Sequence, residues 1–204
     1  MTAAGAQQVD ELEPAELRAP LLESVIAGLN DEQRHVVFDL GVVRSGTVSI
    51  FSDYRCRLDV MALEVGAPHR LDQIEAEEFQ ALIRTSMPPA RGESVDLFLC
   101  WNLLNYLSTE QIGMLLAELT PRFRPGARLH ALIEYSARTM PASPPAFNPV
   151  GPGLLEVTTV DDNEIAAPRY SARDLEQRMP GFEHERTMLL GGGMQEYLFR
   201  RRSA

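Results

Sequence analysis

Asp39 and Gly41 follow directly on the apolar run of residues 35–38. A buried strand followed by an acidic residue and a glycine turn is typical of the start of a nucleotide-binding loop, because glycine lets the backbone approach a ligand closely. Ser45 and Gly46 are the small residues that remain to complete the loop. We therefore expect this turn to belong to a cofactor site, although Asp39 could instead cap the turn that follows the strand.

A second candidate wall of the site follows the apolar run of residues 94–100. Trp101 and Asn102 end this run, and Trp101 could line a pocket or could pack in the core. Asn102 and Asn105 could be polar groups of a pocket, or one of them could cap the turn after the strand. Tyr135 ends a third apolar run and is a further candidate contact, or an ordinary surface residue.

Other kinds of catalytic centre find little support in the sequence. No Ser/His/Asp or Cys/His arrangement, phosphate loop or zinc motif is visible. Both cysteines, Cys56 and Cys100, lie in apolar segments without metal-ligand spacing, which favours reduced, packed thiols. The histidines are scattered, and for each we expect a structural role: His35, His69, His130 and His184.

Apolar runs of strand length alternate with amphipathic segments along most of the chain. Such alternation predicts an α/β fold, in which a mostly parallel sheet carries helices on both faces. Ligands of such sheets bind beyond the carboxyl ends of the strands, so the site should lie near Gly41, Glu64, Trp101 and Tyr135.

Local signals predict the boundaries of several elements. Apolar residues at helical spacing predict helix within residues 14–30, with Pro20 acceptable in a first turn. Ser108 with Gln111 has the spacing of a capping box and predicts the start of another helix. Residues 140–153 contain five prolines, which predicts a long loop at the functional edge.

The whole chain has the composition of a globular protein. Its 204 residues are 45% apolar and 24% charged, which predicts one domain over residues 14–204 after a flexible terminus at 1–13. The net charge of −10 argues against nucleic acid as a partner. We see no apolar run of the roughly 20 residues that a membrane span needs and no secretory signal, so we expect a cytoplasmic protein.

In the order of these segments the chain resembles the class I, Rossmann-like S-adenosylmethionine-dependent methyltransferases. The segment "VVFDLG" is similar to the first strand and turn of that family, and "VDLFLCWNLLNYLSTEQIGMLLAELTPRFRPGARLHALI" is similar to its fourth strand, helix and fifth strand. "YSARDLEQRMPGFEHERTMLL" is similar to the end of the fold. The resemblance implies a seven-stranded, mostly parallel sheet whose last strand is antiparallel.

The resemblance also implies S-adenosylmethionine as the cofactor. Asp39 and Gly41 match the first turn of the family, while Val43 stands at the second glycine, so that the loop is degraded. The acid that would accept hydrogen bonds from the ribose hydroxyls falls near Ala62 by the family's spacing, and Glu64 is the acid that could replace it. Trp101 and Asn102 occupy the position of the segment after the fourth strand.

Two functions are compatible with these features. In the first, the chain is a methyltransferase-fold pseudoenzyme with weak or lost S-adenosylmethionine binding, which binds a protein or a small molecule. In the second, it is an active methyltransferase for a small molecule or a protein, since methyl transfer depends mainly on positioning. A homodimer that pairs through residues 194–201 or through the proline-rich segment is compatible with either.

Overall fold

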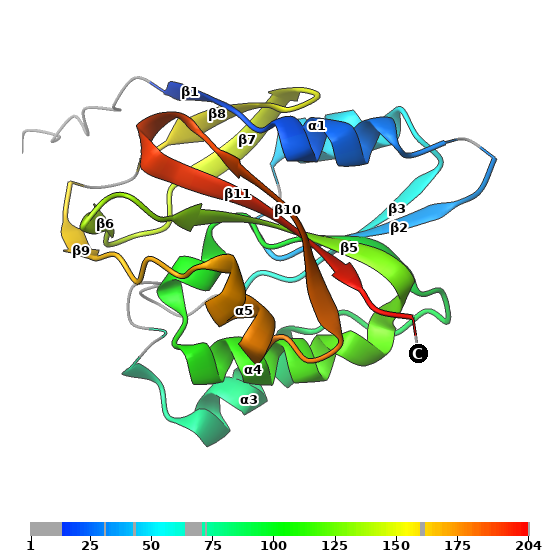
Figure 1. Cartoon of the computed structure of the whole chain (residues 1–204). Coiled ribbons are helices and arrows are strands. Elements are labelled where there is room, and N and C mark those ends of the chain that lie inside the picture. The colour runs from blue at the N-terminus through cyan, green and yellow to red at the C-terminus, as the bar shows by residue number, and fades with distance from the viewer. Residues whose placement is uncertain are drawn as a thin grey trace, which may run out of the picture.

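The structure is a computed structural model that describes residues 14–30, 32–42, 44–63, 71, 73–159 and 162–203. The predictions made for residues 1–13, and for Val43, Glu64 and His69, lie outside these ranges. Figure 1 shows a twisted central sheet with helices on both sides.

The central sheet has the strand order β10-β11-β5-β4-β2-β3. Its strands are β2 (His35–Asp39), β3 (Cys56–Val60), β4 (Val95–Leu99), β5 (Phe123–Glu134), β10 (Phe182–Leu189) and β11 (Met194–Arg201). Strands β2 to β5 run parallel, and β11 runs antiparallel to both of its neighbours. The predicted α/β fold, with its mostly parallel sheet and antiparallel last strand, is confirmed.

The number of strands differs from the prediction. Within the described residues the central sheet has six strands, whereas the resemblance implied seven. In the sequence, the missing strand would fall between β3 and β4. Of the described residues in that interval, 61–63 are not in a strand and Ala76–Ser86 form helix α3. The sequence itself contains six apolar runs that became strands of this sheet, and the seventh came only from the resemblance.

Helices cover both faces of the sheet, as the alternating pattern predicted (Figure 1). Helices α3, α4 (Thr109–Leu119) and α5 (Ala172–Arg178) bury apolar side chains in one core, and α1 (Pro20–Ala27) and α2 (Ser45–Ser52) contribute to a second. Apolar stripes at helical spacing allow each helix to bury one side in this way. None of the described helices is long and apolar enough to cross a membrane.

Helix α4 begins with the predicted capping box. The Gln111 backbone N–H donates to Ser108 Oγ at 3.2 Å, and the Ser108 N–H donates to Gln111 Oε1 at 2.9 Å. These bonds satisfy amides that have no partner within the helix. Helix α4 runs directly after the turn that follows β4, so the cap fixes the path by which the chain leaves the candidate site.

Helix α1 begins at Pro20, later than the sequence suggested, because residues 15–18 form strand β1 (Ala15–Arg18). Ala19 has no side chain that could cap the helix. The Glu196 carboxylate from β11 accepts hydrogen bonds from the Leu21 and Leu22 N–H groups at 2.8 and 2.7 Å. A fully buried acid of the central sheet therefore caps α1, and it also lies 2.8 Å from His130 Nε2.

The proline-rich segment is not the long loop that was predicted. Strand β7 (Ala146–Gly151) lies within it and pairs with β8 (Leu154–Thr158), which also pairs with β1. The sequence Met140–Gly153 also contributes to β6 (Thr139–Pro141), which pairs with β9 (Glu164–Ala166). Proline is compatible with β7 because β7 is an edge strand with an irregular register between Pro149 and Gly151.

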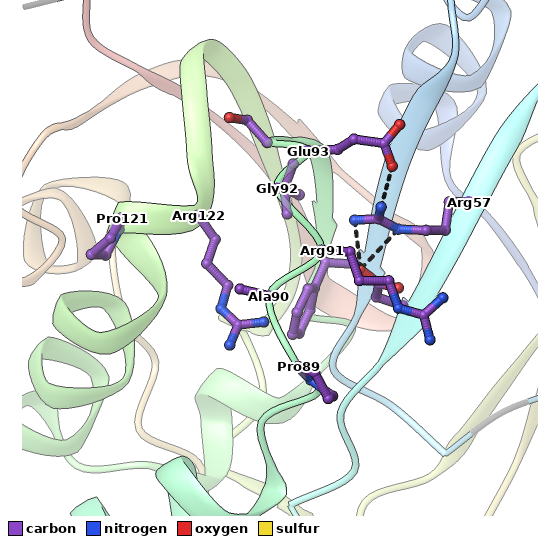
Figure 2. A pocket seen from close by; sticks show the side chains of 12 residues that line it. Arg57, Pro89, Ala90, Arg91, Gly92, Glu93, Pro121 and Arg122 are labelled. Carbon is purple, nitrogen blue, oxygen red and sulfur yellow. Dashed lines mark hydrogen bonds and ion pairs between the residues drawn. The ribbon is translucent and has the colours of Figure 1, made fainter.

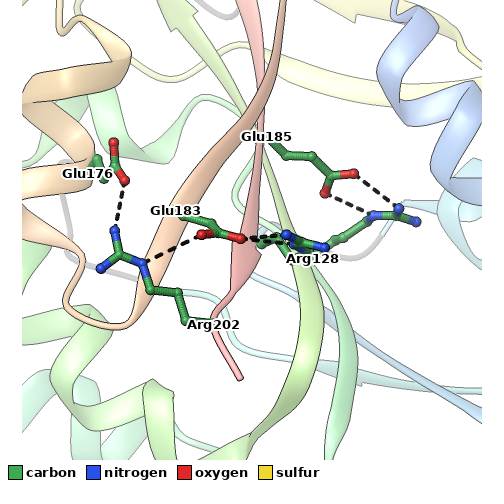
Figure 3. A network of polar contacts seen from close by, with 6 residues as sticks. Arg128, Glu176, Glu183, Glu185 and Arg202 are labelled. Atoms are coloured by element: carbon green, nitrogen blue, oxygen red, sulfur yellow. Dashed lines mark hydrogen bonds and ion pairs between the residues drawn. The ribbon is translucent and has the colours of Figure 1, made fainter. Parts of the chain in front are cut away.

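Strand β10 forms one edge of the central sheet and carries a network of charged side chains (Figure 3). Glu185 accepts two hydrogen bonds from Arg128 of β5, and Glu183 accepts two from Arg200 of β11. Charges on an edge strand oppose pairing with another chain. Both edges of β11 are already paired, so residues 194–201 cannot join two copies by strand pairing, and the homodimer itself stays a prediction.

Candidate functional site

A cavity of about 620 Å³ lies beyond the carboxyl ends of β2, β3 and β4. This is the edge of the sheet at which the alternating pattern placed the site. The volume lies within the range of roughly 300–1,000 Å³ that is usual for small-molecule pockets. The lining comprises Leu40, Gly41, Val42, Arg44, Ala62, Leu63, Leu71, Cys100, Trp101, Asn102, Leu103, Ser143, Pro144, Pro145, Ala146 and Phe147.

Asp39 lies behind this lining, at the end of β2. Its Oδ1 accepts hydrogen bonds from the Gly41 N–H at 2.8 Å and from Trp101 Nε1 at 2.6 Å. A Cβ atom on Gly41 would lie 2.9 Å from Trp101 Cδ1 and 3.0 Å from Asp39 Oδ1. Gly41 is therefore required by this close packing, and the turn cap proposed as the alternative role of Asp39 is present.

Burial changes the acidity of Asp39. Desolvation raises its pKa from 3.8 to about 6, against the opposing effect of the hydrogen bonds from Trp101 and Gly41. Its Oδ2 is buried and has no hydrogen-bond partner. Buried polar atoms are usually paired, so this carboxyl group is destabilised in its charged form.

Trp101, at the end of β4, contacts the small sheet, by which we mean the three-stranded sheet β1-β8-β7. Its backbone has φ 46°, a left-handed conformation that costs energy for a residue other than glycine. The indole stacks on the Phe147 ring of β7, with an interplanar angle of 4° and centroids 6.3 Å apart. Trp101 therefore both lines the cavity and packs in the core, so the two roles that the sequence left open are combined.

Ser45 and Gly46 are not part of the cavity lining, and Gly46 lies against β7. The Gly46 N–H donates to Asn148 Oδ1 at 3.0 Å. A Cβ atom on Gly46 would lie only 1.9 Å from the carbonyl oxygen of Pro149. The glycine at this position is thus explained by the contact between α2 and β7, and the structure brings Gly41, Trp101 and Asn102 together without Ser45 and Gly46.

The position expected for an acid after β3 is part of the cavity wall. Ala62, the residue at which the family's spacing places this acid, lines the cavity. Glu64 lies outside the described residues. Among the described residues that line the cavity, none carries a carboxylate, and Arg44 carries the charge.

The remaining polar candidates differ in whether they line the cavity. The Asn105 side chain donates to the carbonyl oxygens of Asn102 and Leu132 and accepts from the Glu134 N–H. Asn105 therefore ties the turn after β4 to β5, whereas Asn102 lines the cavity. Tyr135 is not part of the lining.

Sequence reasoning missed the other side of the cavity. Residues 143–147 form that side, and they comprise the end of the loop after β6 and the first two residues of β7. The signal was the proline-rich segment itself, which was predicted to lie at the functional edge but without any named residue. Phe147 is an aromatic residue between prolines and could have been singled out on that ground. Leu71 and Leu103 gave no signal, because leucines at helical spacing resemble any core residue.

A second, smaller hollow of about 180 Å³ lies beside the loop that leads into β4 (Figure 2). Arg57 contributes to it and contacts both Asp59, at 3.0 Å, and Glu93. Its charge is therefore already matched by acids of the protein. This hollow does not lie at the carboxyl ends of the strands, so the larger cavity is the better candidate for the functional site.

Comparison with known proteins supports the fold. No protein-family model and no curated protein sequence matches the chain. Among solved structures, it is similar to Burkholderia thailandensis 1,6-didemethyltoxoflavin N1-methyltransferase with bound 1,6-didemethyltoxoflavin and S-adenosylhomocysteine, at 16% identity and TM-score 0.50, over 90% of this chain and 76% of the other. The N-methyltransferase NodS of Bradyrhizobium japonicum WM9 shares 15% identity at TM-score 0.47, over 90% and 92%. The fold is that of class I S-adenosylmethionine-dependent methyltransferases.

Proposed function

We propose that this chain is a methyltransferase-fold protein that holds a small molecule in the cavity beside Trp101 and binds S-adenosylmethionine weakly or not at all. The observation that carries the proposal is the contact between α2 and β7. Free amides at the amino end of the helix after the first turn are the donors that such folds offer to a nucleotide-type ligand. The Gly46 amide is used by Asn148, and the Pro149 carbonyl group lies against the same residue.

The chemistry of the wall after β3 supports the same function. An acid at Ala62 would accept hydrogen bonds from the ribose hydroxyls of the cofactor, and a methyl group cannot. Charge-assisted hydrogen bonds of this kind contribute about 1.5–3 kcal/mol each. Because the described lining has no such acid, we expect the cavity to bind an adenosine group little more tightly than other groups of similar size.

An active methyltransferase is the second candidate, and the cavity is the observation that favours it. The cavity has the volume of a small-molecule pocket and lies at the edge where this fold binds ligands. The 1,6-didemethyltoxoflavin methyltransferase, which shares the fold, has S-adenosylhomocysteine bound. Methyl transfer would then require only that the acceptor atom be held in line with the sulfonium methyl group in a site shielded from water.

Calorimetric titration with S-adenosylmethionine and S-adenosylhomocysteine separates the two functions. We expect a dissociation constant above about 1 mM for the wild-type protein. The Ala62→Asp variant restores an acid and should bind S-adenosylhomocysteine about tenfold more tightly, whereas Ala90→Asp places the same charge on an exposed residue outside the cavity and should change nothing. A wild-type dissociation constant below about 100 µM would support the enzyme and refute the proposal.

A further inference from the structure

Arg44 is a cation in a cavity whose other described lining residues are mainly apolar or aromatic. It precedes α2 as its N-cap residue and is half-buried. Its guanidinium group has no hydrogen bond or ion pair with any residue of the described chain. Other arginines that face neighbouring elements do have an acidic partner, as Arg57 and Arg128 do.

An arginine of this kind suits an anionic ligand. The guanidinium group is planar, stays charged and presents paired donors that match a carboxylate. Asp39, the acid at the end of β2, has its Oδ1 bonded to Trp101 and Gly41 and does not line the cavity. Cys100 lines it, but burial raises the pKa of its thiol well above the usual value, so the thiol stays neutral.

The rest of the lining defines the other half of the ligand. Trp101 and Phe147 present aromatic rings, and Pro144 and Pro145 present flat apolar surfaces beside them. Pockets of this composition bind apolar bodies and use a few polar groups to fix orientation. A guanidinium group without a partner among the described residues, combined with aromatic walls, selects a small molecule that has an apolar body and one carboxylate.

We propose that the cavity binds a small apolar carboxylic acid, with the carboxylate on Arg44 and the apolar body against Phe147 and Pro145. This inference rests on the proposed function, since it names the class of ligand that replaces the cofactor in the same cavity. Arg44 is then the residue that determines specificity for charge. The protein as a whole has a net charge of −10, so binding of an acid depends on this local cation.

The test compares two probes that differ in charge and little in shape, 4-phenylbutyrate and 4-phenylbutyramide, by calorimetry or ligand-observed NMR. The wild-type protein should bind the acid about 10- to 100-fold more tightly than the amide. Arg44→Gln should abolish this preference and leave amide binding unchanged, which also shows that the variant is folded. Arg138→Gln removes an exposed arginine outside the cavity and should keep the wild-type preference.

Three results would overturn the proposal: equal binding of acid and amide by the wild-type protein, an Arg44→Gln variant that keeps the preference, or no binding of either probe at about 10 mM. Titration of the same samples with S-adenosylhomocysteine separates this proposal from the proposed function. Tight cofactor binding together with an intact preference for the acid would refute weak cofactor binding alone. Equal binding of the acid and the amide by the wild-type protein, together with weak cofactor binding, would refute the role of Arg44 alone.

Discussion

At the scale of single residues, Asp39 at the end of β2 is hydrogen-bonded to Trp101, which lines the cavity. The aspartate that looks like a cofactor contact is buried, and its Oδ1 is bonded to the indole and to the Gly41 amide. Its other carboxylate oxygen is buried without a partner. A charged carboxyl group in this environment opposes folding, because its desolvation is only partly offset by two hydrogen bonds.

The Asp39→Asn variant tests this balance. The pKa of Asp39 is raised from 3.8 to about 6 in the folded protein. Protonation of Asp39 therefore contributes to the free energy of unfolding in full below about pH 4, and this contribution is lost as the pH rises through 6. The stability of the wild type relative to Asp39→Asn should fall by about 2 kcal/mol between pH 4 and pH 7. Urea denaturation of both proteins across this range measures the difference. A difference that is constant or rises with pH would show that Asp39 is not desolvated.

At the scale of elements, β7 sets the position of α2. The strand lies so close to the helix that only glycine fits at position 46, and Asn148 bonds to the amide of that glycine. The same strand supplies Phe147, which stacks on Trp101 at the end of β4. The small sheet therefore fixes both the helix that follows the first turn and one wall of the cavity.

A pair of glycine substitutions tests this contact. Gly46→Ala places a Cβ atom 1.9 Å from the Pro149 carbonyl oxygen, and because backbone must move, the variant should lose about 1–3 kcal/mol of stability or more. Gly113→Ala makes the same chemical change in α4, where the nearest atom, the Arg178 carbonyl oxygen, is 3.6 Å away. This control should gain about 0.5–1 kcal/mol, as alanine is the better helix former. Equal effects of the two substitutions on thermal unfolding would contradict the contact.

Much of the architecture could be predicted from local sequence, whereas the contacts around α2 could not. The capping box at Ser108 and the parallel strands depend on residues a few positions apart, so periodicity and capping signals report them. Strand β7 was missed because proline argues against regular pairing, and only its position at the edge of a sheet makes it compatible. The role of Gly46 depends on Pro149, which is about 100 residues away in the sequence, and no local pattern encodes that distance.

At the scale of the whole molecule, the cavity is assembled from parts that are far apart in the sequence. The strand ends near Gly41, Ala62 and Trp101 form its floor, and the segment that leads into β7 forms the opposite wall. The sheet follows the methyltransferase fold, while the added sheet β1-β8-β7 covers the amino end of α2. The lining of this cavity is the basis on which we propose an apolar acid as the ligand.

Fluorine NMR of protein that carries 5-fluorotryptophan tests this account most directly, because Trp101 is the single tryptophan of the chain and lines the cavity. If the cavity holds an apolar acid, 4-phenylbutyrate should move the one resonance to a saturating limit, while S-adenosylhomocysteine at about 0.1 mM should leave it in place. A resonance that the acid does not move, or one that S-adenosylhomocysteine saturates at micromolar concentration, would contradict the account.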